Sequence, residues 1–201
     1  MAELEAQAFW QWFADHQPEF NSLSNPDEPF WDAALAQLKN VDERLWFELS
    51  EVADSEREFV ITAEGHVDAF PIAEELVSLA PKMKRWKFVS LKPPMGFDFT
   101  TRYQGTLFEP KAMWFLPLES ASRPPEFGMR VGVPRLESME ERVAHNAVLV
   151  ILDTGLGERS AALDVNYTEV CELPPDPEDL GYIELRELAT YIRWRKNKQV
   201  P

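Results

Sequence analysis

The sequence predicts an α+β fold: a mixed, mainly antiparallel sheet with an N-terminal helical extension and a C-terminal helix. Three observations support this class. Apolar residues recur three and four positions apart within 1–40, which is typical of amphipathic helices. They alternate with polar residues in 45–64 and 127–133, which is typical of strands. Helical spacing then returns in 178–198.

Length and composition favour one domain. The chain has 201 residues, 45% of them apolar, which is enough to build a hydrophobic core. We therefore expect a single domain over 1–201, with a helical segment at 1–40, an α+β core at 41–173 and a C-terminal helix at 178–198. The expected order of elements is α α β β α β β β α β α. A ferredoxin-like split βαβ core is one arrangement that this order allows.

The first 40 residues are interpreted as two helices. Phe9, Trp12 and Phe13 form one apolar stripe, and Pro18 is expected to end that segment. Asn25 is a capping residue followed by a proline and two acidic residues, which predicts the start of the second helix.

A hairpin and a strand–helix–strand unit are expected next. The segments 45–51 and 58–64 alternate as two antiparallel strands. A helix follows from Asp68 to about Ala80, where Pro81 stops it. The segment 86–91 is the next strand.

Residues 92–105 form a long expected loop. Loops of this length in compact domains are usually functional or mobile. Phe97, Phe99, Arg102 and Tyr103 lie in it, and we take them as candidate binding residues. A ligand function would predict a cavity lined by the three aromatic side chains and neighbouring carboxylates.

The second half alternates again between strand and helix patterns. Two prolines in 106–118 argue for an edge position or two short pieces. A half-buried strand is expected at 127–133. Ser138 with Glu141 fits a capping box for a helix, and a strand is expected around 163–169. Trp194 is expected on the inward face of the last helix.

Residues 147–153 allow two interpretations. The apolar run into Asp153-Thr154-Gly155 resembles the catalytic turn of the aspartic proteases, in which Asp153 would be half of a carboxylate pair. Only one such triplet is present, and the residues after it do not fit that family. Unbroken helical spacing from Ser138 instead predicts a buried helix that ends at Gly155, and we favour this interpretation.

Other candidate chemistry is sparse. His16, His66 and His145 lie far apart and lack metal-ligand spacing, and Cys171 has no matched histidine motif. We therefore expect no metal, no cofactor and no catalytic residue, and we lean against an enzyme. A single cysteine also excludes a disulfide framework.

The net charge of −15 is unevenly distributed. Residues 1–81 carry 18 acidic and three basic side chains, whereas 82–201 carry 17 of each. This acidity disfavours a nucleic-acid partner, because phosphate binding needs a positive surface. Two basic clusters, within 82–92 and 193–198, are interpreted as solvated surface. An anion site, or a patch that pairs with the acidic region of the same chain or of a second copy, is the alternative.

Three tryptophans, Trp10, Trp46 and Trp114, lie on the second face of their predicted elements. Exposed together they would form a binding patch, because aromatic residues anchor interfaces. We favour the alternative that the N-terminal helices cover that face.

The chain has no membrane-span candidate. No run approaches 18 uncharged apolar residues, and the acidic N-terminus lacks the basic start of a signal peptide. A soluble cytoplasmic protein without a membrane partner is therefore expected.

Four segments carry a family resemblance: Phe9-Trp10-Gln11-Trp12-Phe13, Ile61-Thr62-Ala63-Glu64-Gly65, Ala80-Pro81 before Trp86, and Leu152-Asp153-Thr154-Gly155-Leu156-Gly157-Glu158. Together they resemble a family of small bacterial proteins of unknown function. The resemblance covers most of the chain. It implies a soluble bacterial protein and transfers no site residue.

The favoured functional interpretation is a non-enzymatic bacterial protein-binding domain of the inhibitor or immunity type. Its acidic surface would capture a basic protein partner, since opposite charge speeds encounter. The alternative is a small-ligand-binding protein or hydrolase with a pocket at the loop 92–105. An aspartic-protease-like enzyme that uses Asp153 is the third interpretation.

Overall fold

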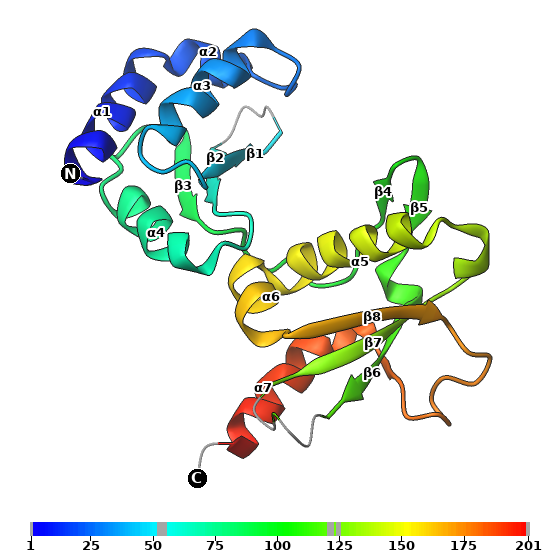
Figure 1. Cartoon of the computed structure of the whole chain (residues 1–201). Helices are drawn as coiled ribbons and strands as arrows, with labels where there is room; N and C mark the ends of the chain where they lie inside the picture. The colour runs from blue at the N-terminus through cyan, green and yellow to red at the C-terminus, as the bar shows by residue number, and fades with distance from the viewer. Residues whose placement is uncertain (1, 52–55, 120–122, 124–125, 200–201) are drawn as a thin grey trace. The chain divides into compact units, whose positions relative to one another are not determined.

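The computed structural model describes residues 2–51, 56–119, 123 and 126–199. The chain divides into two compact units, Met1–Lys92 and Pro93–Pro201, here named unit 1 and unit 2. Each combines helices with small sheets (Figure 1), so the predicted α+β class with helices at both ends is confirmed. The boundary between the units falls inside the segment 41–173 that was expected to form the core.

Unit 1 begins with three helices, α1 (Ala2–Asp15), α2 (Gln17–Ser22) and α3 (Pro29–Lys39). Pro18 lies in the first turn of α2, where a missing N–H is tolerated. Asn25 lies in the turn before α3 and does not cap it, because that helix begins four residues later. The carboxylate of Glu28 accepts hydrogen bonds from the N–H groups of Ser24 and Asn25, both at 3.0 Å, and fixes this turn.

The sheet of unit 1 has the order β1-β2-β3, with β1 (Trp46–Leu49), β2 (Arg57–Thr62) and β3 (Trp86–Ser90). β1 runs antiparallel to β2, and β3 runs parallel to β2 with Phe59 opposite Phe88. A 3-10 turn (Val67–Ala69) and α4 (Phe70–Ser78) connect β2 to β3. Both the predicted hairpin and the predicted strand–helix–strand unit are therefore confirmed.

Aromatic rings fill the interior of unit 1. Phe13 lies edge-on to Phe59 and Trp86, with ring centroids 5.2 and 5.1 Å away. Trp10 is buried, and its indole nitrogen donates to the carbonyl oxygen of Leu76 at 2.8 Å, which ties α1 to α4. Figure 1 shows the helices of unit 1 gathered around its sheet.

One buried cation joins the helices of unit 1 to the sheet. Arg57, only 5% exposed, donates to three main-chain carbonyl oxygens, those of Ser50 (2.9 Å), Leu23 (2.5 Å) and Phe20. Burial lowers the pKa of the guanidinium. These bonds hold the end of α2 against the start of β2.

Unit 2 contains a short hairpin and a four-stranded sheet. The hairpin is β4 (Thr101–Tyr103) with β5 (Thr106–Phe108). The sheet has the order β8-β7-β6-β9, with β6 (Trp114–Leu118), β7 (Gly128–Val133), β8 (Tyr167–Glu172) and β9 (Ile183–Glu184). β6 is antiparallel to both of its neighbours, whereas β7 and β8 are parallel. A 3-10 turn (Pro110–Ala112) separates β5 from β6, so of the two alternatives for 106–118 the two short pieces are confirmed and the edge position is wrong, because β6 pairs on both sides.

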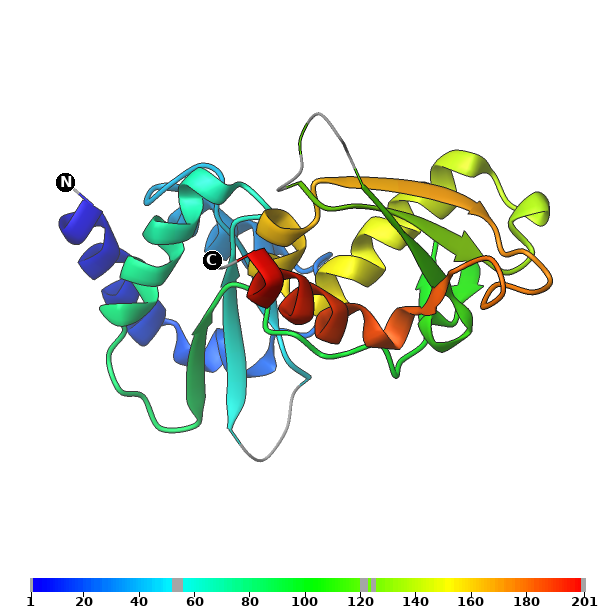
Figure 2. The same ribbon diagram turned by 90° about the horizontal axis from the view of Figure 1, so that it is seen from below.

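Three helices complete unit 2: α5 (Glu141–Leu156), α6 (Glu158–Asp164) and α7 (Leu188–Gln199). Short 3-10 turns precede α5 (Leu136–Ser138) and α7 (Leu185–Glu187). Residues of α5, α7 and the sheet share one hydrophobic core, to which Met129, Val148 and Leu188 belong. Figure 2 shows α7 leading to the C-terminus.

Several local predictions need correction. The strands form three sheets, so the ferredoxin-like arrangement is not formed; β3 pairs within unit 1, and the chain beyond it builds its own sheet. Ser138 caps no helix, because its hydroxyl donates to the carbonyl oxygen of Arg135 at 2.8 Å inside the 3-10 turn. Residues 158–164 are helical, and the strand expected around 163–169 begins at Tyr167.

The predicted helix over 147–153 is confirmed, and its end lies further on than expected. Gly155 is inside α5, and the helix ends at Leu156. Gly157 follows with φ +77°, a backbone conformation that glycine adopts without steric cost.

The tryptophans differ in exposure. Trp46 is 42% exposed, Trp114 is half-buried and Trp10 is buried, so they do not form one patch of exposed residues. Trp194 is 49% exposed, contrary to its expected inward position. No helix in the described part of the chain is long and apolar enough to cross a membrane.

Candidate functional site

The structure places the four residues of the predicted loop site in different surroundings. Phe97 is 4% exposed and belongs to the core of unit 2. Phe99 and Tyr103 are half-buried and pack against that core. Arg102 is exposed on β4, where its guanidinium lies 3.4 Å from the carbonyl oxygen of Gly105. Of the four, only Arg102 is an exposed side chain.

A close contact with α5 explains the position of Phe97. The N–H groups of Met95 and Gly96 donate to the carbonyl oxygens of Thr154 and Gly155, both at 3.0 Å. A Cβ atom on Gly155 would lie 2.2 Å from the Phe97 ring, so only glycine leaves room for this ring. The first role of this part of the loop is therefore to close the core of unit 2.

Asp153 lies at the start of the last turn of α5 and is half-buried. The aspartic-protease interpretation needs Asp-Thr-Gly in a turn after a strand, where two carboxylates can share a proton. A helical backbone does not form that turn. The geometry at Asp153 thus agrees with the helix interpretation.

The three histidines and the cysteine lie in separate surroundings. His16 stacks on Trp12, with ring centroids 4.3 Å apart, and its Nδ1 lies 2.8 Å from the carbonyl oxygen of the same residue. His66 is exposed and His145 is half-buried on α5. Cys171 Sγ lies 3.4 Å from the hydroxyl of Tyr182. Within the described residues, no group of three His, Cys, Asp or Glu side chains could hold a metal ion.

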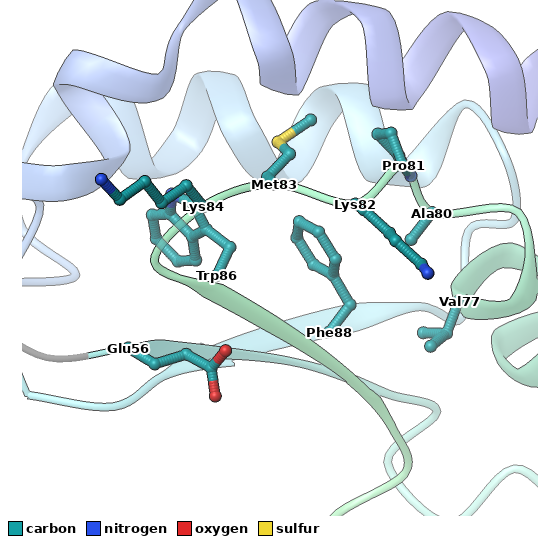
Figure 3. Close-up of a pocket in the computed structure, with 9 residues that line it drawn as sticks. All are labelled: Glu56, Val77, Ala80, Pro81, Lys82, Met83, Lys84, Trp86 and Phe88. Carbon is teal, nitrogen blue, oxygen red and sulfur yellow. The ribbon is translucent and has the colours of Figure 1, made fainter.

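A pocket of about 480 Å³ lies in unit 1 where α4 connects to β3 (Figure 3). We name it the α4–β3 pocket. Its lining combines apolar side chains with two lysines and one glutamate: Glu56, Val77, Ala80, Pro81, Lys82, Met83, Lys84, Trp86 and Phe88. The sequence instead predicted a candidate pocket at the loop 92–105.

The connection between α4 and β3 is shaped by local sequence. Pro81 cannot continue a helix, and α4 ends at Ser78. The N–H of Trp86 reaches back to the carbonyl oxygen of Met83 at 3.3 Å, and Arg85 takes a left-handed φ of +75°. This turn carries Lys82, Met83 and Lys84 past the side chains of β3, as Figure 3 shows.

The aromatic side of the pocket is rigidly built. The rings of Trp86 and Phe88 are nearly parallel, at 7°, with centroids 6.4 Å apart. Phe13 supports both rings edge-on, with centroids 5.1 and 5.3 Å away. Val77 and Ala80 add aliphatic surface from α4. A ligand in this pocket would therefore contact apolar surface on two sides.

The two lysines differ from most other cations of unit 1. Lys87 pairs with Glu58 at 2.7 Å, and Lys92 lies 3.4 Å from Glu48. Other cations of unit 1 with partners include Arg44 with Asp42, Lys39 over the Trp46 ring, and Arg57 on carbonyl oxygens. Lys82 and Lys84 are exposed and have neither a carboxylate nor a hydrogen-bond partner among the residues that the structure describes.

A buried donor completes the site. The indole nitrogen of Trp86 is buried and has no hydrogen-bond partner within the described chain, and the whole residue is only 5% exposed. Leaving such an N–H group unsatisfied costs about 1–3 kcal/mol. Figure 3 shows the exposed Lys84 side chain beside this indole, at the edge of the pocket.

Together these groups offer charged and apolar contacts to a ligand. The indole N–H and the two exposed lysines can attract an anionic group, although Figure 3 shows the two ammonium groups on opposite sides of the pocket, and the rings can contact an apolar part of the same ligand. Glu56, just before β2, disfavours a second negative charge. The nine lining residues include no histidine, cysteine, serine or threonine that could act as a nucleophile or as a neutral-pH base.

Comparisons with known proteins transfer no residue to this site. A scan of protein-family models and a search of curated proteins found no match to the chain. The charge pattern alone indicated Lys82 and Lys84 as part of an alternative anion site. The site residues Trp86, Phe88 and Glu56 were missed. Alternation in β3 indicates that Trp86 and Phe88 share a face, but it does not show whether the indole N–H has a hydrogen-bond partner.

Proposed function

We propose that this protein is a non-enzymatic binding protein and that unit 1 binds a monoanionic ligand with an apolar part in the α4–β3 pocket. One observation supports this above all: the buried Trp86 N–H has no partner among the described residues and lies in the same pocket as Lys82 and Lys84. An oxygen acceptor would satisfy the donor, and the lysines would supply the opposite charge.

The charge of unit 1 makes this local arrangement selective. The unit carries 18 acidic and eight basic residues, a net charge of −10 that repels polyanions. The short-range attraction between an anionic ligand and Lys82 or Lys84 must therefore outweigh the long-range repulsion from the net negative charge of the unit. A single carboxylate meets this condition better than a phosphate chain or a nucleic acid.

The test uses 3-phenylpropionate, which combines one carboxylate with one aromatic ring, and its neutral amide as control. We expect the acid to shift the Trp86 indole N–H signal in nitrogen-edited NMR spectra, with a weaker response to the amide. Trp86→Phe removes the donor and should weaken binding about tenfold or more, the contribution of a hydrogen bond to a charged group.

Lysine variants separate the site from the general charge. Lys82→Gln with Lys84→Gln should weaken binding of the acid, while Lys111→Gln, an exposed lysine of unit 2, should leave it unchanged. If the acid leaves the Trp86 signal unmoved at concentrations well above 1 mM, where binding energies fall below about 4 kcal/mol, the proposal is wrong.

A second candidate function is capture of a basic protein through the acidic surface, as an inhibitor or immunity-type protein does. The observation in its favour is the charge of −10 on unit 1, where most cations are already engaged by the unit's own groups. Binding of a lysine-rich peptide should then fall steeply between low and moderate salt. Binding that is indifferent to salt would contradict electrostatic capture.

A further inference from the structure

The strand that lines the pocket has a free edge. In the order β1-β2-β3, β3 has a neighbour on one side only. The N–H of Arg57 donates to the carbonyl oxygen of Arg85 at 2.7 Å, and the N–H of Leu91 donates to that of Ile61 at 2.8 Å. Because bonding residues alternate along a strand, 85, 87, 89 and 91 face β2. Phe88 and Ser90 direct their main-chain groups outward.

These outward groups are open in the part of unit 1 that the structure describes. Neither Phe88 nor Ser90 has a main-chain hydrogen bond on that side. An exposed row of N–H and C=O groups is a template for another strand. The side chain of Phe88, on the same strand, lines the α4–β3 pocket.

Charge sets a direction along this edge. Lys82 and Lys84 precede β3, and the unpartnered indole belongs to its first residue, Trp86. The anion-binding end of the pocket therefore lies at the start of the strand. A chain that runs antiparallel to β3 would reach this end last, with its carboxyl terminus.

We propose that the ligand is the C-terminal end of a polypeptide, which adds to β3 as an antiparallel strand and places its terminal carboxylate at Trp86, Lys82 and Lys84. This inference rests on the proposed function, because it names the anion as a main-chain carboxylate. Strand addition and capture of a terminal carboxylate are recurrent modes of peptide recognition.

The lining specifies the last residue of such a peptide. Its side chain would enter the pocket against Phe88, Met83 and Val77, which favours an aromatic or large aliphatic residue. Glu56 disfavours an acidic one. The main chain of the peptide would exchange hydrogen bonds with Phe88 and Ser90, which a small free anion cannot do.

The probe is an acetylated hexapeptide that ends in threonine-valine-phenylalanine, prepared with a free carboxylate and as the amide. We expect the acid to bind at least about tenfold more tightly than both its amide and 3-phenylpropionate, since it adds charge-assisted and main-chain hydrogen bonds. The Phe88 and Ser90 amide signals should shift, and their hydrogen exchange should slow, together with the change at the Trp86 indole.

Ser90→Pro tests the strand addition directly. Proline removes an outward N–H on an edge strand without touching the bonds to β2. The variant should keep its affinity for 3-phenylpropionate and lose most of the additional affinity for the peptide, whereas Ser90→Ala should retain both. Peptides methylated at alternate main-chain nitrogens repeat the test on the wild-type protein, should the proline variant fold poorly.

Two results would overturn this inference while leaving the proposed function intact: equal affinity for the acid and amide peptides, or a Trp86 response without any change at Phe88 and Ser90. A Trp86 signal that is insensitive to both 3-phenylpropionate and the peptide would remove the proposed function and the inference together.

Discussion

Unit 1 and unit 2 both pack helices against a small sheet, yet their interiors differ in kind. In unit 1 the large fully buried side chains include Phe9, Phe13, Phe20 and Phe59, which meet mostly edge to face or at a tilt. In unit 2 most of the core is aliphatic, from β7, α5 and α7. Trp86 and Phe88 of this aromatic interior also line the α4–β3 pocket, so in unit 1 the same group of rings contributes to the core and to the candidate site.

The two units also use different devices to join distant segments. Unit 1 uses a buried charge, because the Arg57 guanidinium bridges three carbonyl oxygens of α2, the segment after it and the start of the hairpin loop. Unit 2 uses close approach, because Gly155 lets the Phe97 ring lie against the backbone of α5. The first device depends on satisfied polar groups, and the second depends on the absence of a side chain.

The largest effect is expected from Arg57→Met. The substitution keeps an unbranched apolar stem but removes every donor to the carbonyl oxygens of Ser50, Phe20 and Leu23. We expect the free energy of unfolding to fall by about 3–5 kcal/mol, since several buried acceptors lose their partners at once. Urea denaturation followed by far-ultraviolet circular dichroism measures the change.

Arg44→Met is the matched control in the same unit. Arg44 pairs with Asp42 two residues away, and its side chain is 34% exposed. Its loss should change stability far less than the loss of Arg57, because exposed ion pairs contribute little. Equal effects of the two substitutions would contradict the role of Arg57 as the link between helices and sheet.

A smaller effect is expected from Gly155→Ala in unit 2. Alanine normally favours a helix over glycine by about 1 kcal/mol. Here its Cβ would meet the Phe97 ring at 2.2 Å, so overpacking should destabilise the protein by about 1–3 kcal/mol. Thermal and urea unfolding of the variant measure the sign as well as the size.

A double substitution at Gly155 and Phe97 provides the control. In a Phe97→Leu background the same alanine should cost less, because the ring that it displaces is gone. A stabilising effect of Gly155→Ala in the wild-type background would show that the loop does not depend on this close approach.

The smallest expected effect is on the pH dependence of stability, to which two ion pairs contribute. A hydrogen bond from Arg130 lowers the pKa of Glu169, and one from Arg44 lowers the pKa of Asp42. A carboxyl group with a lowered pKa in the folded state stabilises the protein above its ordinary pKa. That stabilisation is lost as the pH falls through the lowered value.

The two pairs should differ in how much they contribute to that pH dependence. Arg130 and Glu169 lie on paired strands, 2.7 Å apart but 39 positions apart in sequence, so unfolding separates them. Asp42 and Arg44 stay close in any state of the chain. We expect Arg130→Gln to raise the Glu169 pKa in NMR titrations and to reduce the acid sensitivity of stability more than Arg44→Gln does. Equal reductions would contradict this difference.

Patterns within a few neighbouring residues predicted several strands and one helix end correctly. Alternation identified the hairpin of β1 and β2 and the strand β7, and Pro81 correctly limited α4. The end of α5 was predicted one residue too early, at Gly155, because Gly155 and Gly157 both suit a helix terminus. Contact with Phe97 requires the first glycine inside the helix, and a left-handed φ requires the second after it.

The candidate site was only partly predictable, because the sequence shows which side chains are charged and does not show which distant residues contact them. The charge pattern drew attention to the basic cluster within 82–92, which contains Lys82 and Lys84, but an anion site was only the alternative to solvated surface. It could not show that these lysines lack carboxylate partners while Lys87 and Lys92 have them. The loop residue Phe97 showed the opposite error, because an aromatic side chain in a long loop resembles a binding residue until its packing partner is known.

The sequence by itself determined the α+β class, the strand and helix segments and the concentration of acidic residues in the first part of the chain. These properties follow from side-chain periodicity and charge, which act over a few residues. Only the tertiary structure decided that the strands form three sheets in two units and that, among the residues it describes, β3 keeps one edge free and the Trp86 N–H has no partner. Strand pairing and donor satisfaction depend on which distant segments meet, and that is set by the burial of apolar surface across the whole unit.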